Sequence, residues 1–130
     1  KDRKALIKGV KDRTIDCIVT NHMPQNIEEK QCEFDLAEFG QSAIDTAYSA
    51  YQTHLSEKIS VEKWVEVSSL NPRRIFNQNL PTIKEGETAN ITVFDTDLEW
   101  NVTPTGIKSK SKNTPFIGGK LIGKVLDVVC

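Results

Sequence analysis

The hydrophobic positions in the first part of the chain fall into short runs separated by polar stretches. Residues 15–20 read I-D-C-I-V-T, a nearly continuous apolar run, and they follow a helical pattern at residues 2–7. Such a run is typical of a strand that is buried on both faces, as in a parallel sheet covered by helices. In parallel α/β proteins, ligands bind just past the carboxyl ends of the strands. The polar residues that end this run, Asn21, His22 and Gln25, are therefore the first candidates for a functional site.

Three helices are predicted after a charged connection over residues 27–41. Ser42 is expected to cap the first helix, because Asp45 follows it at the spacing of a capping box and apolar residues then recur at helical intervals. Ser60 is expected to begin the second helix. Asn71, followed by a proline, is expected to cap a short third helix.

The pattern changes to that of strands in the last part of the chain. Residues 89–93 and 98–102 are candidate strands, and residues 120–129 form a third that is rich in Val, Leu and Ile. We therefore predict an α/β unit with extra helices over residues 1–80 and a small β module over residues 81–130.

Composition and charge exclude several classes of protein. The 130 residues include 17 Lys and Arg against 18 Asp and Glu, a net charge of −1, which argues against a nucleic-acid module held by phosphate contacts. No apolar run approaches the roughly 20 residues that a membrane span needs. Cys17, Cys32 and Cys130 are odd in number and form no CxxC pair, so we expect free thiols in a reducing, cytoplasmic compartment. The chain lacks an initiator Met, so we expect it to be a piece of a longer protein.

The residues alone do not assemble a catalytic centre. Metal ligation needs several convergent donors, and His22 and His54 are the only histidines, so no metal site is expected within this chain. A histidine at a strand end is more often a structural residue than a ligand, and His54 is expected at the surface. The run K-S-K-S-K at 108–112 could bind an anion, but a solvated basic loop is favoured because no glycine-rich cradle accompanies it.

Four segments carry a resemblance to a known family. Residues 14–25, T-I-D-C-I-V-T-N-H-M-P-Q, with E-E-K at 28–30, resemble the dihydroorotase segment that usually reads T-I-D-x-I-x-T-D-H-A-P-H and then E-E-K. N-P-R-R-I-F at 71–76 is similar to the N-P-A-x-I-x of that family. E-G-E-T-A-N-I-T-V-F-D at 85–95 is similar to a strand of amidohydrolases, and S-K-S-K-N-T-P-F-I-G at 109–118 resembles a signature of the dihydroorotases found in multifunctional complexes.

The resemblance implies a fold and a reaction. The fold would be the carboxyl-terminal part of a (β/α)8 TIM-like barrel plus strands of a small β-sandwich. The family reaction is the reversible, zinc-dependent hydrolysis of dihydroorotate to N-carbamoyl aspartate in pyrimidine biosynthesis, in which metal-bound hydroxide attacks while a carboxylate takes and returns the proton. The remaining zinc ligands of the family come from earlier strands, so this chain alone is expected to bind no zinc.

The catalytic positions depart from the family pattern. Asn21 stands where the family has the aspartate that acts as base and metal ligand, and Gln25 stands where it has the histidine that binds the substrate carboxylate, beside His22. Met23 replaces a small alanine, and Ala43 replaces the second glycine of a G-x-x-G turn. An amide is neither a usable proton acceptor nor a good ligand for a hard metal.

These departures favour a dihydroorotase-like protein that is catalytically impaired or inactive and acts as a scaffold. Its expected partners are the remaining barrel portion and either aspartate carbamoyltransferase or a second copy of the protein, with no nucleic acid and no membrane. The alternative is an active dihydroorotase or related cyclic-amide hydrolase whose metal ligands lie in a missing amino-terminal portion. An independent small binding module is a weaker third possibility, because the strand at residues 15–20 would need neighbours on both sides.

Overall fold

The structure is a computed structural model that describes residues 1–130. The chain divides into two compact units. Unit 1 comprises residues 1–19, 54–94 and 125–130, and unit 2 comprises residues 20–53 and 95–124. Each unit has its own packing and is described by itself. The predicted boundary near residue 80 stays a prediction.

Unit 1 begins with the helix that the opening pattern predicted. Helix α1 spans Asp2–Lys11, with an acidic residue in its first turn and basic residues in its last, which matches the helix dipole. Val10 is buried, and Gly9 lies so close to Ile15 that an added Cβ would be 3.0 Å from the Ile15 Cδ1 atom. The helix therefore packs directly on the segment that follows it.

The other helices of unit 1 form one continuous run. Helix α3 (Val61–Val65) passes into a π-helical turn (Glu66–Leu70) and then into α4 (Asn71–Ile75). Ser60 caps α3 as predicted, because its side chain accepts the Lys63 N–H.

The predicted cap at Asn71 is wrong, since the helical run passes through this position without a break. The proline that follows it has no N–H, and its ring would clash with the carbonyl of a regular preceding turn. The wider π turn just before it is where the run accommodates this proline. The Asn71 side chain instead donates to the Asp16 carbonyl at 2.9 Å.

The prediction of a buried strand at residues 15–20 is wrong for this chain. These residues pair with no strand, Cys17 is only half-buried and Val19 is 75% exposed. The Ile18 N–H donates to the carbonyl of the fully buried Val67, at 3.0 Å, which ties the segment to the helical run. The physical reason is that no other strand of the 130 residues lies beside the segment to pair with it.

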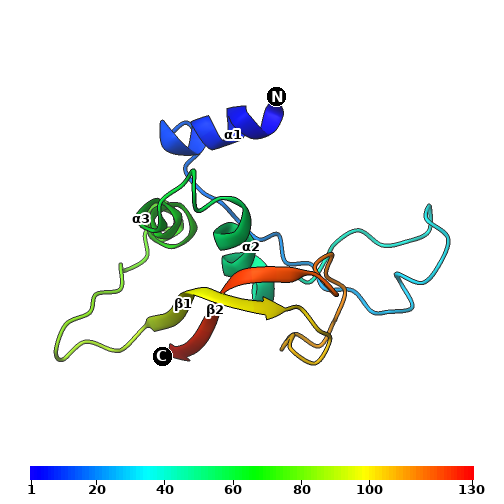
Figure 1. The fold of residues 1–130 in the computed structure, drawn as a ribbon. Helices are drawn as coiled ribbons and strands as arrows, with labels where there is room; N and C mark the ends of the chain where they lie inside the picture. The colour runs from blue at the N-terminus through cyan, green and yellow to red at the C-terminus, as the bar shows by residue number, and fades with distance from the viewer. The chain divides into compact units, whose positions relative to one another are not determined.

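Strands β1 (Ile91–Asn101) and β2 (Lys120–Val129) form a two-stranded sheet, drawn in Figure 1 as two arrows of opposite direction. The strand predicted at 120–129 is confirmed. The two strands predicted at 89–93 and 98–102 are one strand, because the polar stretch between them stays in the sheet. Within this polar stretch the Asp95 carboxylate accepts the N–H groups of Asp97 and Leu98, at 2.8 and 3.0 Å.

The core of unit 2 lies at the end of the sheet. Val102, Ile107 and Leu121 are buried together, and Trp100 and Phe116 pack against them. A short 3₁₀ turn (Ile44–Thr46) leads into helix α2 (Ala47–His54), and His54 is exposed as predicted.

Helix α2 lies directly on strand β2 in unit 2. Gly123 has a φ of +79°, and a Cβ at this residue would lie 2.7 Å from Gln52 Cγ and 3.0 Å from Tyr48 Cε1. The Ser49 hydroxyl donates to the Gly123 carbonyl at 2.5 Å, and the Trp100 indole N–H donates to the same oxygen at 3.1 Å. Glycine is therefore required where the helix touches the strand.

None of the helices combines the length and the apolar character needed to cross a membrane.

Candidate functional site

The three candidate residues Asn21, His22 and Gln25 all lie in unit 2, in the segment that follows residue 19. Asn21 is exposed and has a φ of +47°, in the left-handed region that asparagine tolerates better than most residues. His22 forms an isolated parallel bridge with Gln41, whose carbonyl accepts the Met23 N–H at 3.0 Å. The candidates therefore sit beside the turn that leads to helix α2.

His22 takes the place of the predicted helix cap. Its Nδ1 atom accepts the backbone N–H groups of Ala43 and Ile44, at 3.0 and 3.2 Å. The first N–H groups of a helix have no partner inside the helix, so a side-chain acceptor there stabilises the helix start. Ser42, the predicted cap, is buried and its hydroxyl has no hydrogen-bond partner in the chain. Sequence spacing could not reveal this, because the acceptor comes from 21 residues earlier.

Gln25 is engaged with its own chain. Its amide nitrogen donates to the Phe39 carbonyl at 3.0 Å. The side chain thus closes the segment against the turn at residues 39–44 and carries no charge.

Gly40 is required by the same turn. Its φ is +116°, and a Cβ there would lie 2.5 Å from the Met23 carbonyl oxygen and 2.6 Å from Met23 Cβ. No side chain fits at that distance. The first glycine of the G-x-x-G turn is therefore a packing requirement, and the position of the second, Ala43, supplies an N–H to His22.

A loop from the far end of the sequence joins this neighbourhood. The Asp45 carboxylate accepts the N–H groups of Lys108 and Ser109, at 2.8 and 3.3 Å, and the Ser109 hydroxyl. Partial burial raises the pKa of Asp45, but the hydrogen bonds from Ser109 and Lys108 outweigh burial and hold this pKa below its ordinary value. Asp45 therefore does not reach back to Ser42 as a capping box would require.

The basic run at 108–112 folds into a turn that Lys112 holds by hydrogen bonds within the loop. The Lys112 ammonium donates to the Ile107 and Ser109 carbonyls at 2.6 and 2.7 Å. Asn113 holds the turn as well, because its amide donates to the Gly40 carbonyl at 3.2 Å. Two backbone N–H groups of the run, those of Lys108 and Ser109, donate to Asp45 and are not free to bind an anion. The spacing of residues along the chain did not predict that this loop lies beside the candidate residues. The motif at 109–118 was the only sequence signal for it.

The residues of this chain do not fit a metal centre by themselves. No group of three or more His, Cys, Asp and Glu side chains lies close enough to hold a metal ion. In the pattern of the family that the chain resembles, a carboxylate that ligates the metal stands at the position of Asn21. The neutral amide of Asn21 is a poor ligand for zinc. These 130 residues alone therefore do not complete a zinc centre.

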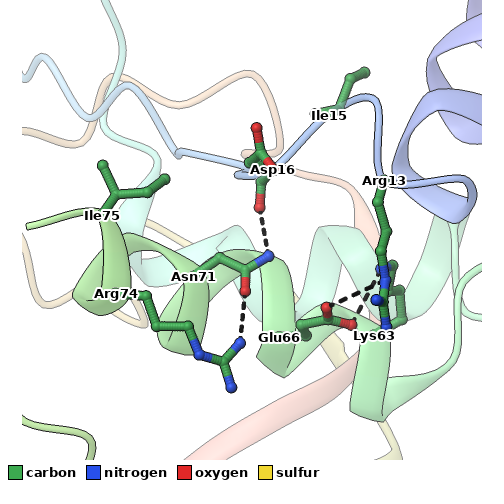
Figure 2. A pocket seen from close by; sticks show the side chains of 8 residues that line it. All are labelled: Arg13, Ile15, Asp16, Lys63, Glu66, Asn71, Arg74 and Ile75. Atoms are coloured by element: carbon green, nitrogen blue, oxygen red, sulfur yellow. Dashed lines mark hydrogen bonds and ion pairs between the residues drawn. The ribbon is translucent and has the colours of Figure 1, made fainter.

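A separate cavity of about 320 Å³ lies in unit 1 (Figure 2). Figure 2 shows the Glu66 carboxylate facing Lys63 and Arg13, at 3.1 and 3.9 Å. The hydrogen bond from Lys63 lowers the pKa of Glu66. Asn71 bridges the two sides of the cavity, since it donates to the Asp16 carbonyl and accepts from Arg74 at 2.8 Å. No sequence pattern predicted this cavity, which brings residues more than 50 positions apart together.

Comparison with known proteins identifies relatives along nearly the whole chain. The dihydroorotase of Chlorobaculum tepidum is 41% identical over 130 residues, which are 98% of this chain and 30% of that protein. The dihydroorotase of Caldicellulosiruptor saccharolyticus is 41% identical over 131 residues, which are 99% of this chain and 30% of that protein. The chain thus spans about 30% of the length of the curated relatives it matches. The resemblance drawn from the sequence motifs is confirmed.

The structure has a solved counterpart in part of a larger chain. A crystal structure of D-hydantoinase from Bacillus sp. AR9 matches it with a TM-score of 0.79 and 21% identity, over 97% of this chain and 29% of that chain. At this identity the likeness shows the fold alone: an α/β segment that corresponds to part of a hydantoinase. No model of a protein family matches the chain.

Proposed function

This chain is related in sequence, along almost its whole length, to a segment of the dihydroorotases, and from that premise we propose that it is the carboxyl-terminal part of a catalytically impaired dihydroorotase-like protein of pyrimidine biosynthesis. Residues 1–80 would supply the last strand and helices of a (β/α)8 barrel. Strands β1 and β2 would belong to a small β-sandwich. The protein would act as a scaffold in the cytoplasm.

The observation that carries this proposal is Asn21. It occupies the position at which the family has its catalytic aspartate, and an amide cannot take the proton that hydrolysis of a cyclic amide must move. Loss of a general base typically lowers a rate by about 10²–10⁴.

Gln25 supports the same conclusion. The family histidine at this position contacts the carboxylate of the substrate. Here a neutral amide stands instead, and its nitrogen donates to the Phe39 carbonyl. A substrate carboxylate would have to compete with that bond and would gain no positive charge from the side chain.

The exposed segment at residues 15–20 supports the remaining barrel portion as the first partner of the proposed scaffold. Residues 15–20 carry strand-like apolar side chains and pair with no strand, and Val19 is 75% exposed. Neighbouring strands from a remaining barrel portion would cover these side chains. Aspartate carbamoyltransferase or a second copy of the protein is the proposed further partner, by analogy with inactive dihydroorotase-like subunits.

The alternative is an active hydrolase whose zinc ligands lie outside these 130 residues, with Asn21 orienting a water molecule. The similarity to dihydroorotases over 98% of the chain favours this reading as well. It requires another group to act as the base.

The test is the turnover of dihydroorotate by the full-length protein that contains this segment. We expect the unmodified protein to be slower than its Asn21→Asp variant by about 10²-fold, and the further change Gln25→His to lower KM. Asn26→Asp, the same chemical change at an exposed neighbour whose side chain makes no hydrogen bond, is the matched control and should leave the rate unchanged.

Two outcomes would overturn the proposal in favour of the active enzyme. The first is an unmodified protein that turns over dihydroorotate as fast as an ordinary dihydroorotase assayed beside it. The second is stoichiometric zinc in the purified protein together with an Asn21→Asp variant no faster than the unmodified protein.

A further inference from the structure

We propose that His22 is a positioning residue with two different edges: Nδ1 caps the helix that leads into α2, and Nε2 carries a proton that it can donate to a ligand oxygen. The cap is independent of the proposed function. The identity of the ligand, a carboxylate or carbonyl oxygen of a cyclic amide, rests on the proposed function.

The tautomer follows from the hydrogen bonds. A neutral imidazole has one nitrogen that accepts and one that donates. The Nδ1 atom of His22 faces two N–H donors, from Ala43 at 3.0 Å and Ile44 at 3.2 Å, so it is the unprotonated nitrogen. Nε2 therefore bears the hydrogen.

This assignment separates two roles that a histidine beside a catalytic position could have. A metal binds the lone pair of the unprotonated nitrogen of a neutral imidazole. In His22 that nitrogen is Nδ1, and its lone pair already accepts two N–H groups. Nε2 is protonated and has no lone pair to offer. The Nε2–H group has no partner in the chain and is not fully buried in the half-exposed His22, which leaves it free to donate a hydrogen bond. His22 can thus donate to an oxygen and does not ligate a metal in this conformation.

The cap also places the residue before it. His22 is held between the two N–H groups and the bridge to Gln41, which leaves Asn21 in the left-handed conformation with φ +47°. The histidine consequently positions the residue on which the proposed function depends. Its effect on that residue passes through the backbone.

The first experiment reads the tautomer directly. Histidine labelled with ¹⁵N in the ring is incorporated into the full-length protein, and the His22 signal is assigned by its loss in the His22→Asn variant. We expect long-range ¹⁵N–¹H correlation to show Nδ1 unprotonated and Nε2 protonated. A protonated Nδ1 would overturn the proposal, whatever the protein does with dihydroorotate.

The second experiment uses two substitutions that each keep one edge of the ring. The amide of asparagine reaches the place of Nδ1, and the longer amide of glutamine reaches the place of Nε2. We expect His22→Gln to accelerate hydrogen exchange of the Ala43 and Ile44 amides by about fivefold, the usual effect of a lost cap of about 1 kcal/mol. His22→Asn should leave that exchange close to the unmodified rate.

The affinity of the same two variants for a ligand should rank in the opposite order. Titration with dihydroorotate should show weaker binding for His22→Asn than for His22→Gln, because only the second keeps a donor at the outer edge. Equal exchange in both variants would overturn the cap, and equal loss of binding would overturn the donor role. If the unmodified protein binds no dihydroorotate, the ligand assignment fails together with the proposed function, while the tautomer and exchange results still decide the cap.

Discussion

Two consecutive segments, residues 15–19 and residues 20–26, are held in place by different kinds of contact. Residues 15–19 of unit 1 have the pattern of a buried strand, yet they pair with no strand and are held to a helix through the Ile18 N–H. Residues 20–26 of unit 2 have no regular pattern, yet His22 and Gln25 are each fixed by a hydrogen bond to the turn at residues 39–44. A strand depends on a neighbour that can lie outside the segment, whereas a loop can satisfy its polar groups within its own unit.

The largest effect expected is at Gly40, where the turn meets Met23. Gly40→Ala combines a strained φ with an overlap against a backbone oxygen, so it should lower the free energy of unfolding of unit 2 by about 3 kcal/mol or more. Gly118→Ala, in the same unit and at a φ of +80° with nothing within 4 Å, should lose only about 1 kcal/mol. Urea unfolding of a Trp64→Phe background isolates the fluorescence of Trp100, which lies in unit 2. Equal losses in the two variants would mean that the turn is not tightly packed.

The second effect concerns the contact between α2 and β2 within unit 2. Gly123→Ala places a Cβ 2.7 Å from Gln52 Cγ and should cost about 2–3 kcal/mol. Gly118→Ala is the control, because its φ of +80° is almost the same and its surroundings are open, which leaves a cost of about 1 kcal/mol. The same Trp100 fluorescence measures both. A Gly123→Ala loss no larger than the control would show that the helix does not rest on this strand.

The third prediction tests the unpaired segment of unit 1. Cys17 is half-buried in the 130-residue chain, and strands from a remaining barrel portion would cover it. Its thiol should react with a maleimide at least about tenfold more slowly in the full-length protein than in the 130-residue chain. Exposed Cys32 should react at similar rates in both. A Cys17 rate unchanged between the two would contradict the idea that more polypeptide completes this segment.

The smallest effect is expected at Asp45, which ties the basic loop to the start of the helix. Its pKa in the folded protein lies below the ordinary value of 3.8, so its bonds stabilise unit 2 above that pH and are lost as the pH falls through the folded pKa. Asp45→Asn should cost about 1 kcal/mol at pH 7 and reduce the loss of stability on acidification. Asp97→Asn, at an exposed carboxylate, is the control. Identical acid unfolding curves for the two variants would contradict this assignment.

Much of the local structure could be read from the sequence, because short-range patterns control it. Helix α1, the Ser60 cap and strand β2 follow from spacing and capping preferences within a few residues. The family resemblance also lay in the motifs themselves, and relatives 41% identical confirm it. Asn21 and Gln25 were visible as departures at the positions that the motif defines.

The tertiary structure decided which partners each polar group finds. Ser42 has the better capping sequence, but His22, 21 residues away, reaches the helix N–H groups, and Asp45 turns to Lys108 and Ser109. Asn71 was expected to cap a helix and instead holds the Asp16 carbonyl. Capping preferences describe neighbours in sequence, whereas hydrogen-bond acceptors serve whichever donor the fold brings within about 3 Å. The sequence by itself therefore determined helix α1, the Ser60 cap, strand β2 and the motif departures at Asn21 and Gln25, and the tertiary structure determined how those two residues are held.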